Sequence, residues 1–154
     1  MTNSSEIAEI VSRREALLRA TVGLEDALAG PVGDGETWRL RVAMAVDHAV
    51  ARVEEHVAQT EGPGSILDDV LQLAPRLSRR IDQMLHDHER LQKSGHTLSV
   101  SVAELEQLTG DELKERAIEV RNEAVDMMGQ ITRHRQRGSD LIYEAYNVDL
   151  GNSA

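Results

Sequence analysis

The sequence contains no cysteine and no phenylalanine, and its only aromatic residues are Trp38, Tyr143 and Tyr146. Without cysteine, disulfide bonds, thiolate zinc sites, cysteine nucleophiles and ordinary iron–sulfur ligation are excluded. Sheet sandwiches favour aromatic and β-branched residues, whereas small aliphatic side chains suit closely packed helices. The composition therefore favours an all-α protein.

Long apolar runs and an excess of positive charge are also missing. No segment approaches the about 18 consecutive apolar residues of a membrane-spanning helix, and the N-terminus lacks a basic stretch followed by an apolar one. The net charge of −10 opposes binding to nucleic acid and to anionic membrane surfaces. We therefore expect a cytoplasmic protein with no nucleic-acid partner and no membrane partner.

What the chain does have is apolar residues at helical spacing along most of its 154 residues, the length of one domain. They predict long helices over about residues 5–28, 34–61, 75–94 and 109–148. The sequence predicts an antiparallel up-down four-helix bundle with an extra short helix, residues 65–73, between helices 2 and 3. Residues 1–150 form this single domain and residues 151–154 a frayed tail.

Glycine and proline separate the predicted helices. They cluster at residues 29–35 and 62–64, and Pro75 fits best as the first residue of helix 3. Residues 94–102 are predicted to be a connection, and residues 102–108 a short helical turn. Thr109 and Glu112 have the spacing of a capping box, which predicts the start of helix 4.

Helix 4 carries a seam of inward positions spaced alternately four and three residues apart, as in a bundle of antiparallel helices. The seam comprises Val120, Ala124, Met127, Ile131, His134, Gly138, Leu141, Ala145 and Val148. One histidine therefore lies on an otherwise small or apolar face.

Three of the six histidines occupy inward positions, each on a different predicted helix: His56, His88 and His134. One interpretation is that their imidazoles converge and bind a metal ion, as in many helical bundles. The other is that each is a core histidine satisfied by a carbonyl, a carboxylate or water. Charged neighbours predict that His48 and His86 face solvent.

The residues around these histidines resemble the hemerythrin-like (HHE) family of four-helix bundles, which bind a non-haem di-iron centre. His56 matches the histidine of the second-helix His-x-x-x-Glu motif, with Thr60 at the carboxylate position. Asp87-His88 matches the Glu-His pair of the third helix, and His134 matches the histidine of the fourth. The resemblance implies a metal site, with iron as the expected metal, and the ligands His56, His88 and His134.

Several family ligands are replaced in this chain. Gln92 stands where a second histidine of helix 3 is expected, and Gly138 and Ser139 stand where the fourth-helix acid is expected. Arg13 and Arg14 occupy the place of the first-helix histidine. Because a di-iron centre needs bridging carboxylates, the pattern argues against oxygen carriage. Glu61 is a weaker candidate ligand.

Helix lengths predict how the histidines are arranged along the bundle. With a rise of about 1.5 Å per residue, His88 lies roughly 20 Å below Pro75, whereas His56 lies near the end of helix 2. We therefore expect His56 and His134 to form a pair near Glu61, Asp68 or Asp69. All three histidines share a level only if helix 3 is shifted by about two turns.

Two other segments suggest interactions. Arg133 and Arg137 share a helix face and suggest an anion site, but Asp140 and Glu144 on the same helix favour intrahelical ion pairs. Residues 143–150 end a long helix with two tyrosines, which suggests a homodimer or a protein partner at this end.

The leading interpretation is a non-enzymatic, hemerythrin-like bundle with a rearranged metal site. The alternative is a metal-free interaction module that binds a protein partner, and an enzyme using carboxylate chemistry comes third.

Overall fold

The computed structural model describes the backbone of residues 4–148; side chains are described for these residues except 4–7, 9–11, 13, 14 and 148. This part of the chain contains no strand. It forms five α-helices: α1 (Ser4–Ala29), α2 (Glu36–Thr60), α3 (Ile66–Leu73), α4 (Ser78–Glu104) and α5 (Gly110–Tyr143). The prediction of an all-α protein with a short helix in its middle is confirmed. The predicted tail, residues 151–154, lies outside the described residues.

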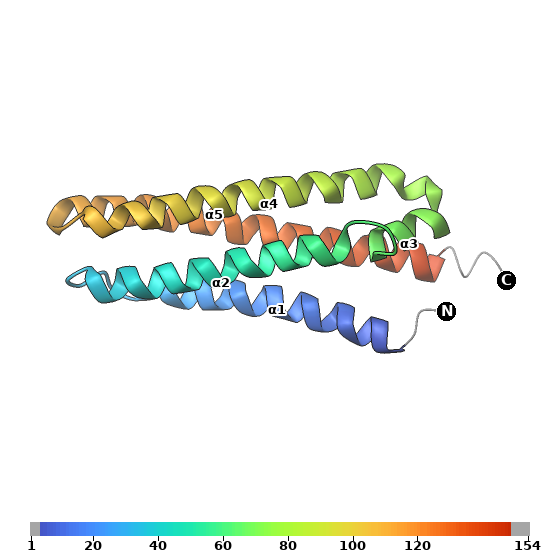
Figure 1. Ribbon diagram of the computed structural model, residues 1–154, viewed down its shortest axis with the longest axis horizontal. Coiled ribbons are helices and arrows are strands. Elements are labelled where there is room, and N and C mark those ends of the chain that lie inside the picture. The colour runs from blue at the N-terminus through green and yellow to red at the C-terminus, as the bar shows by residue number, and fades with distance from the viewer. Residues whose placement is uncertain (1–3, 149–154) are drawn as a thin grey trace.

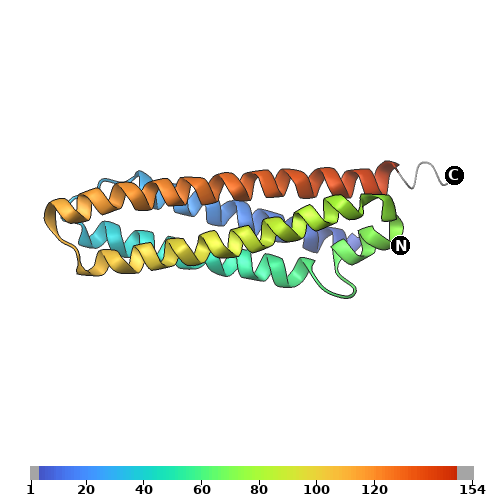
Figure 2. The same ribbon diagram turned by 90° about the horizontal axis from the view of Figure 1, so that it is seen from above.

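The four long helices lie side by side as a bundle, and α3 lies at one end of it (Figure 1). Around the bundle, α1 contacts α2, α2 contacts α4, α4 contacts α5, and α5 contacts α1. The turned view shows the same arrangement, with α3 near the C-terminal end of α5 (Figure 2). None of the described helices is both long enough and apolar enough to cross a membrane.

The larger of two apolar clusters, which we call the bundle core, runs along α1, α2, α4 and α5. Trp38 is its largest side chain and is fully buried, with the guanidinium of Arg121 located 5.3 Å from the ring centroid. The other members are mostly Leu, Val and Ala, as the composition predicts. The seam predicted for the fourth long helix, which is α5 in the structure, is confirmed in the bundle core, since Val120, Ala124, Met127 and Ile131 are all buried.

A smaller apolar cluster, the end cluster, closes the other end of the bundle. In it Leu67 and Val70 of α3 pack with Leu141 of α5 and with Ala145 of the π-helical turn Glu144–Val148, which follows α5. Within residues 143–150, for which the sequence suggested a partner, Ala145 and Tyr146 thus pack against the chain itself. Tyr143 remains exposed over 64% of its surface, and residues 149–150 lie outside the described part of the chain.

The predicted connection at residues 94–102 is wrong, because α4 continues as a helix to Glu104. Gly95 and several polar residues lower the helix propensity of this segment. Tertiary packing outweighs that preference, since Leu98 and Val102 are buried in the bundle core. A Cβ atom at Gly95 would lie 3.3 Å from Val50, so the small residue allows α4 to lie close to α2. The predicted turn at residues 102–108 is the end of α4 followed by the 3₁₀ turn Leu105–Gln107.

The turn between α2 and α3 depends on glycine, because Gly62 and Gly64 have φ angles of 97° and 77°. Ser65 then caps α3 by accepting a hydrogen bond from the backbone N–H of Asp68. Pro75 begins the 3₁₀ turn Pro75–Leu77, which leads directly into α4. At the start of α5, Thr109 is the N-cap residue, but its side chain accepts no capping hydrogen bond. The predicted helix start is therefore confirmed, but the predicted capping box does not form.

Candidate metal centre

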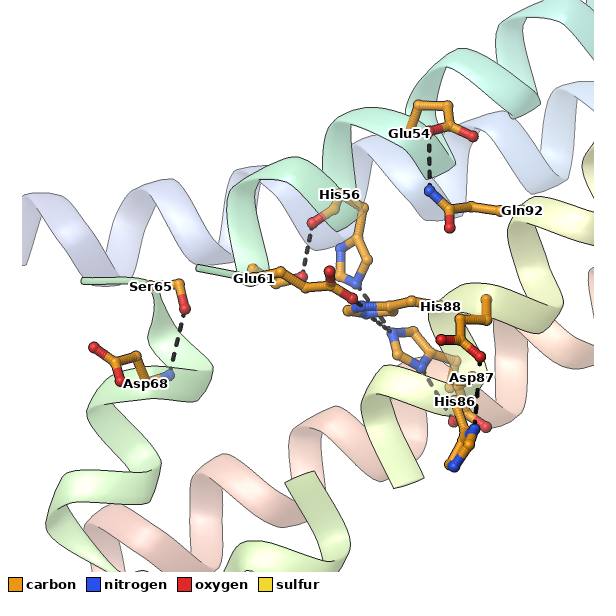
Figure 3. A network of polar contacts seen from close by, with 12 residues as sticks. Glu54, His56, Glu61, Ser65, Asp68, His86, Asp87, His88 and Gln92 are labelled. Carbon is orange, nitrogen blue, oxygen red and sulfur yellow. Dashed lines mark hydrogen bonds and ion pairs between the residues drawn. The ribbon is translucent and has the colours of Figure 1, made fainter. Parts of the chain in front are cut away.

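His56, His88 and His134 come together inside the bundle, one each from α2, α4 and α5. The Nε2 atom of His134 lies 3.0 Å from Nε2 of His56 and 3.1 Å from Nε2 of His88. His88 and His134 are each 1% exposed, and His56 is half-buried. We call these three residues the histidine layer. Figure 3 shows the rings of His56 and His88 converging, with Glu61 beside His88.

The sequence predicted a pair of histidines, and the structure instead brings three together. His88 lies between Met84 of the end cluster and Leu91 of the bundle core. The shift of about two turns that this arrangement requires comes from α3 and the turn Pro75–Leu77. These elements carry the chain past the end of α2 before α4 begins (Figure 1).

Glu61, at the C-cap of α2, holds the ring of His88. Its Oε1 atom lies 2.8 Å from Nδ1 of His88. Because the carboxylate of Glu61 accepts at Nδ1, a neutral His88 carries its proton there and presents a lone pair on Nε2. Glu61 therefore lies near the site as predicted, but its carboxylate contacts Nδ1 of His88 and not the position that the Nε2 atoms surround.

Asp87 holds His134 in the same way from α4. Its Oδ2 atom lies 3.2 Å from Nδ1 of His134, and the two carboxylate oxygens accept hydrogen bonds of 2.8 and 2.9 Å from Arg137. Burial raises the pKa of Asp87, but the hydrogen bonds from Arg137 and His134 outweigh burial and the net pKa is lowered. Asp87 is therefore an ionised, buried acceptor that orients His134.

His134 itself is neutral at physiological pH. Burial, together with the electrostatic effect of the nearby His88, lowers its pKa to about 4, although the hydrogen bond to Asp87 acts in the opposite direction. A neutral His134 that donates from Nδ1 to Asp87 has a lone pair on Nε2. In the form in which His88 also carries its proton on Nδ1 alone, the Nε2 lone pairs of His88 and His134 face each other across 3.1 Å.

Two of the three separations between the ligand atoms are close to those of a histidine metal site. A tetrahedral ion with metal–nitrogen distances of about 2.0–2.1 Å separates its ligands by about 3.3 Å. The two short Nε2 separations are within a few tenths of an ångström of that value, and all three ligand atoms lie within 4.8 Å of one another. Histidine ligands commonly donate their second N–H to a carboxylate, as His88 and His134 do here.

The histidine layer also borders a small cavity of about 50 Å³ on the side of the end cluster. Its walls are mostly apolar and include Ile66, Leu67, Met84, Leu141 and Ile142. On its other side, half-buried His56 borders a larger groove of about 220 Å³ between α1 and α2. That groove is lined by polar and small residues, namely Ser12, Ala16, Arg52, Glu55 and Gln59.

The other sequence predictions about charged residues have mixed outcomes. His48 and His86 are exposed, as predicted, and His96 is an exposed residue of α4. Asp68 interacts with Gly64 and Gln72, and Asp69 is exposed. The side chains of Arg13 and Arg14 lie outside the described residues.

The predicted intrahelical ion pairs of α5 are wrong. Arg137 pairs with Asp87 of α4, and Glu144 pairs with Arg76 and Arg80. Both interactions link separate elements, because the partners lie closer across the helix interface than along the helix. Asp87 is the site residue that sequence reasoning missed. The available signal was a carboxylate next to an inward histidine, with an arginine three residues after His134.

Comparisons of the chain with protein-family models, with curated proteins and with solved structures find no match.

Proposed function

We propose that this chain is a metal-binding helical bundle in which His56, His88 and His134 bind one divalent transition-metal ion. The observation that carries the proposal is the convergence of three Nε2 atoms while carboxylates occupy Nδ1 of His88 and His134. A cation between the nitrogens would accept the lone pairs that otherwise face each other. It would also balance the negative charges of Asp87 and Glu61.

The cost of this arrangement supports a binding role. Burying polar groups is costly even when they are hydrogen-bonded, and apolar side chains in these inward positions would extend the core without that cost. The neighbouring positions Met84, Leu91 and Ile131 are apolar, so the helices themselves do not require polar residues at this level. A ligand bound by the imidazoles would offset the cost of burying the histidine layer.

The donor set favours a mononuclear site with an open coordination position. Imidazole ligands suit Zn²⁺, Fe²⁺, Ni²⁺ and Cu²⁺, and three histidines leave the fourth tetrahedral position for another ligand. Asp87 and Glu61 contact the Nδ1 atoms, so neither is placed to bridge two metal ions. Iron remains the metal suggested by the resemblance to hemerythrin-like bundles.

We extend the proposal to the architecture and role of the chain. It would be an antiparallel up-down four-helix bundle of the hemerythrin-like kind, which binds a metal in the cytoplasm without being an enzyme. The partner-binding alternative is less well supported, because Leu141 and Ala145 pack within the end cluster. A dimer through the end of α5 stays a prediction, which light scattering at high concentration would test.

The proposal is tested by metal content. Untagged protein is reconstituted anaerobically with Fe²⁺ or Zn²⁺, and bound metal is measured by mass spectrometry after removal of free ions. We expect about one ion per chain. The variants His88→Leu and His134→Leu should lose it, whereas His86→Leu, an exposed histidine on the same helix as His88, should retain it.

Circular dichroism of each variant shows whether the helices remain folded. Absence of bound metal from correctly folded wild-type protein would overturn the proposal. Two irons per chain, lost in the His134→Leu variant, would replace the mononuclear site by a dinuclear one. Retention of the ion in both His88→Leu and His134→Leu would place the metal elsewhere.

A further inference from the structure

The wall of the small cavity beside the histidine layer includes one charged residue. Arg135, adjacent to His134 in α5, lines it together with apolar side chains of α3, α4 and α5. Apart from the histidines, Arg135 is the only ionisable residue among the described residues that line this cavity. The cavity therefore has mostly apolar walls to which three histidines and one arginine also contribute.

Arg135 differs from the neighbouring arginine on the same helix. Arg137 is bound by both carboxylate oxygens of Asp87. The Nε atom of half-buried Arg135 is shielded from solvent and has no hydrogen-bond partner among the described residues. A buried donor of this kind is costly to leave unsatisfied, and guanidinium groups pair well with carboxylates.

We propose that the cavity binds a small monocarboxylate such as acetate. This inference rests on the proposed metal site. The carboxylate would occupy the open position of the metal and pair with Arg135, and its alkyl group would lie against Met84 and the apolar residues of α3 and α5. An anion satisfies the metal ion and the guanidinium together, because both carry positive charge.

The size of the cavity limits the ligand. A cavity of about 150 Å³ lined by aliphatic side chains holds benzene, so about 50 Å³ accommodates only a few heavy atoms. Acetate, with its four heavy atoms, is at the upper limit of this range, and longer acyl chains exceed it. The mostly apolar walls favour an organic anion over a strongly hydrated inorganic one, because they offer few polar groups to replace the lost water.

The test uses full-length protein loaded with Co²⁺, whose visible absorption reports its coordination. Bound cobalt is first counted by mass spectrometry in wild type, Arg135→Gln and Arg133→Gln. Sodium acetate is then titrated at constant ionic strength, with acetamide as the neutral isostere and chloride as the inorganic anion. Arg133 is an exposed arginine on the same helix, so its variant controls for the loss of one positive charge.

We expect acetate to change the cobalt spectrum in wild type and in Arg133→Gln, and to bind about tenfold or more weakly in Arg135→Gln. Acetamide should have little effect. A cobalt-loaded protein that ignores acetate, binds acetamide or chloride equally well, or is unaffected by Arg135→Gln would overturn the carboxylate site while leaving the metal site standing. Failure to bind cobalt would overturn both proposals and is visible before any titration.

Discussion

The bundle core and the histidine layer occupy neighbouring levels of the same helices, but different forces organise them. In the bundle core, residues such as Leu24, Leu98 and Val120 are fully buried and make non-directional contacts. In the histidine layer, each imidazole of His88 and His134 has one nitrogen facing a carboxylate and the other facing the centre. The core depends on volume, whereas the layer depends on direction and charge.

The difference shows how a helical bundle can separate stability from binding. Apolar packing on both sides of the histidine layer holds the helices at a fixed separation. Within the layer, Asp87 orients the ring of His134 and Glu61 orients the ring of His88. Their Nε2 lone pairs can then point, with that of His56, toward one position. Substitutions in the bundle core should therefore alter mainly stability, and substitutions in the histidine layer mainly the proposed metal binding.

The largest expected effect comes from the bundle core. Leu98→Ala removes a fully buried side chain about ten residues along α4 from His88, and we expect the free energy of unfolding to fall by about 2–5 kcal/mol. Metal stoichiometry should be unchanged, because the two positions share no contact and their effects should be independent. Urea denaturation of the metal-free protein measures the first effect, and mass spectrometry the second.

His88→Leu provides the matched substitution within the histidine layer. It should reduce the stability of the metal-free protein by much less than Leu98→Ala does, because a polar group gives way to an apolar one and Glu61 is open enough to turn toward water. If Leu98→Ala also abolished metal binding, or if His88→Leu were the more destabilising change, the separation between the two regions would not hold.

The second effect is a dependence of stability on pH that originates in the histidine layer. The pKa of His134 is about 4 in the folded protein and about 6.5 in the unfolded chain, so the unfolded state binds more protons between these values. The contribution of neutral His134 to the free energy of unfolding is fully present above about pH 6.5 and is lost as the pH falls toward 4. We expect up to about 3 kcal/mol to be lost over this range in metal-free protein.

Urea denaturation at several pH values, with a chelator present, measures this dependence. The comparison that isolates it is His134→Leu, in which the slope between pH 6.5 and 5 should be much smaller. Equal slopes in the two proteins would assign the pH dependence to other groups.

The smallest effect concerns the residue that orients His134. Asp87→Asn removes the charge that Nδ1 of His134 faces, and we expect metal affinity to fall about 10- to 100-fold without loss of stoichiometry. Competition with a chromophoric chelator measures the affinity. Asp82→Asn, an exposed acid on the same helix, should leave it unchanged. An unaltered affinity in Asp87→Asn would limit Asp87 to its ion pair with Arg137.

The sequence was most informative where the apolar periodicity is regular. The seam of α5 and the inward positions of His56, His88 and His134 follow from residue spacing, which fixes the face of a helix. Spacing does not fix the relative heights of different helices. Those heights depend on how far α3 and the turn Pro75–Leu77 extend the chain beyond α2, and this placement kept the third histidine from being predicted at the same level.

The remaining errors have a related cause. Residues 94–102 have weak helix propensity, but burial of Leu98 and Val102 determines their structure. The pairing of Arg137 with Asp87 required knowledge of which helix lies beside α5. Interactions within one helix can be inferred from the sequence, whereas interactions between helices depend on the packing of the whole bundle.

The origin of the three histidines on α2, α4 and α5 gives the site a topological consequence. His56 and His134 are 78 positions apart in the chain, and α1 contributes no histidine because the first in the sequence is His48. A bound ion would cross-link the chain into two closed loops, from residue 56 to 88 and from 88 to 134. The first helix would lie outside both loops as an arm attached by packing alone, so the metal would divide the bundle into a cross-linked unit of three long helices and one that can separate without breaking a coordinate bond.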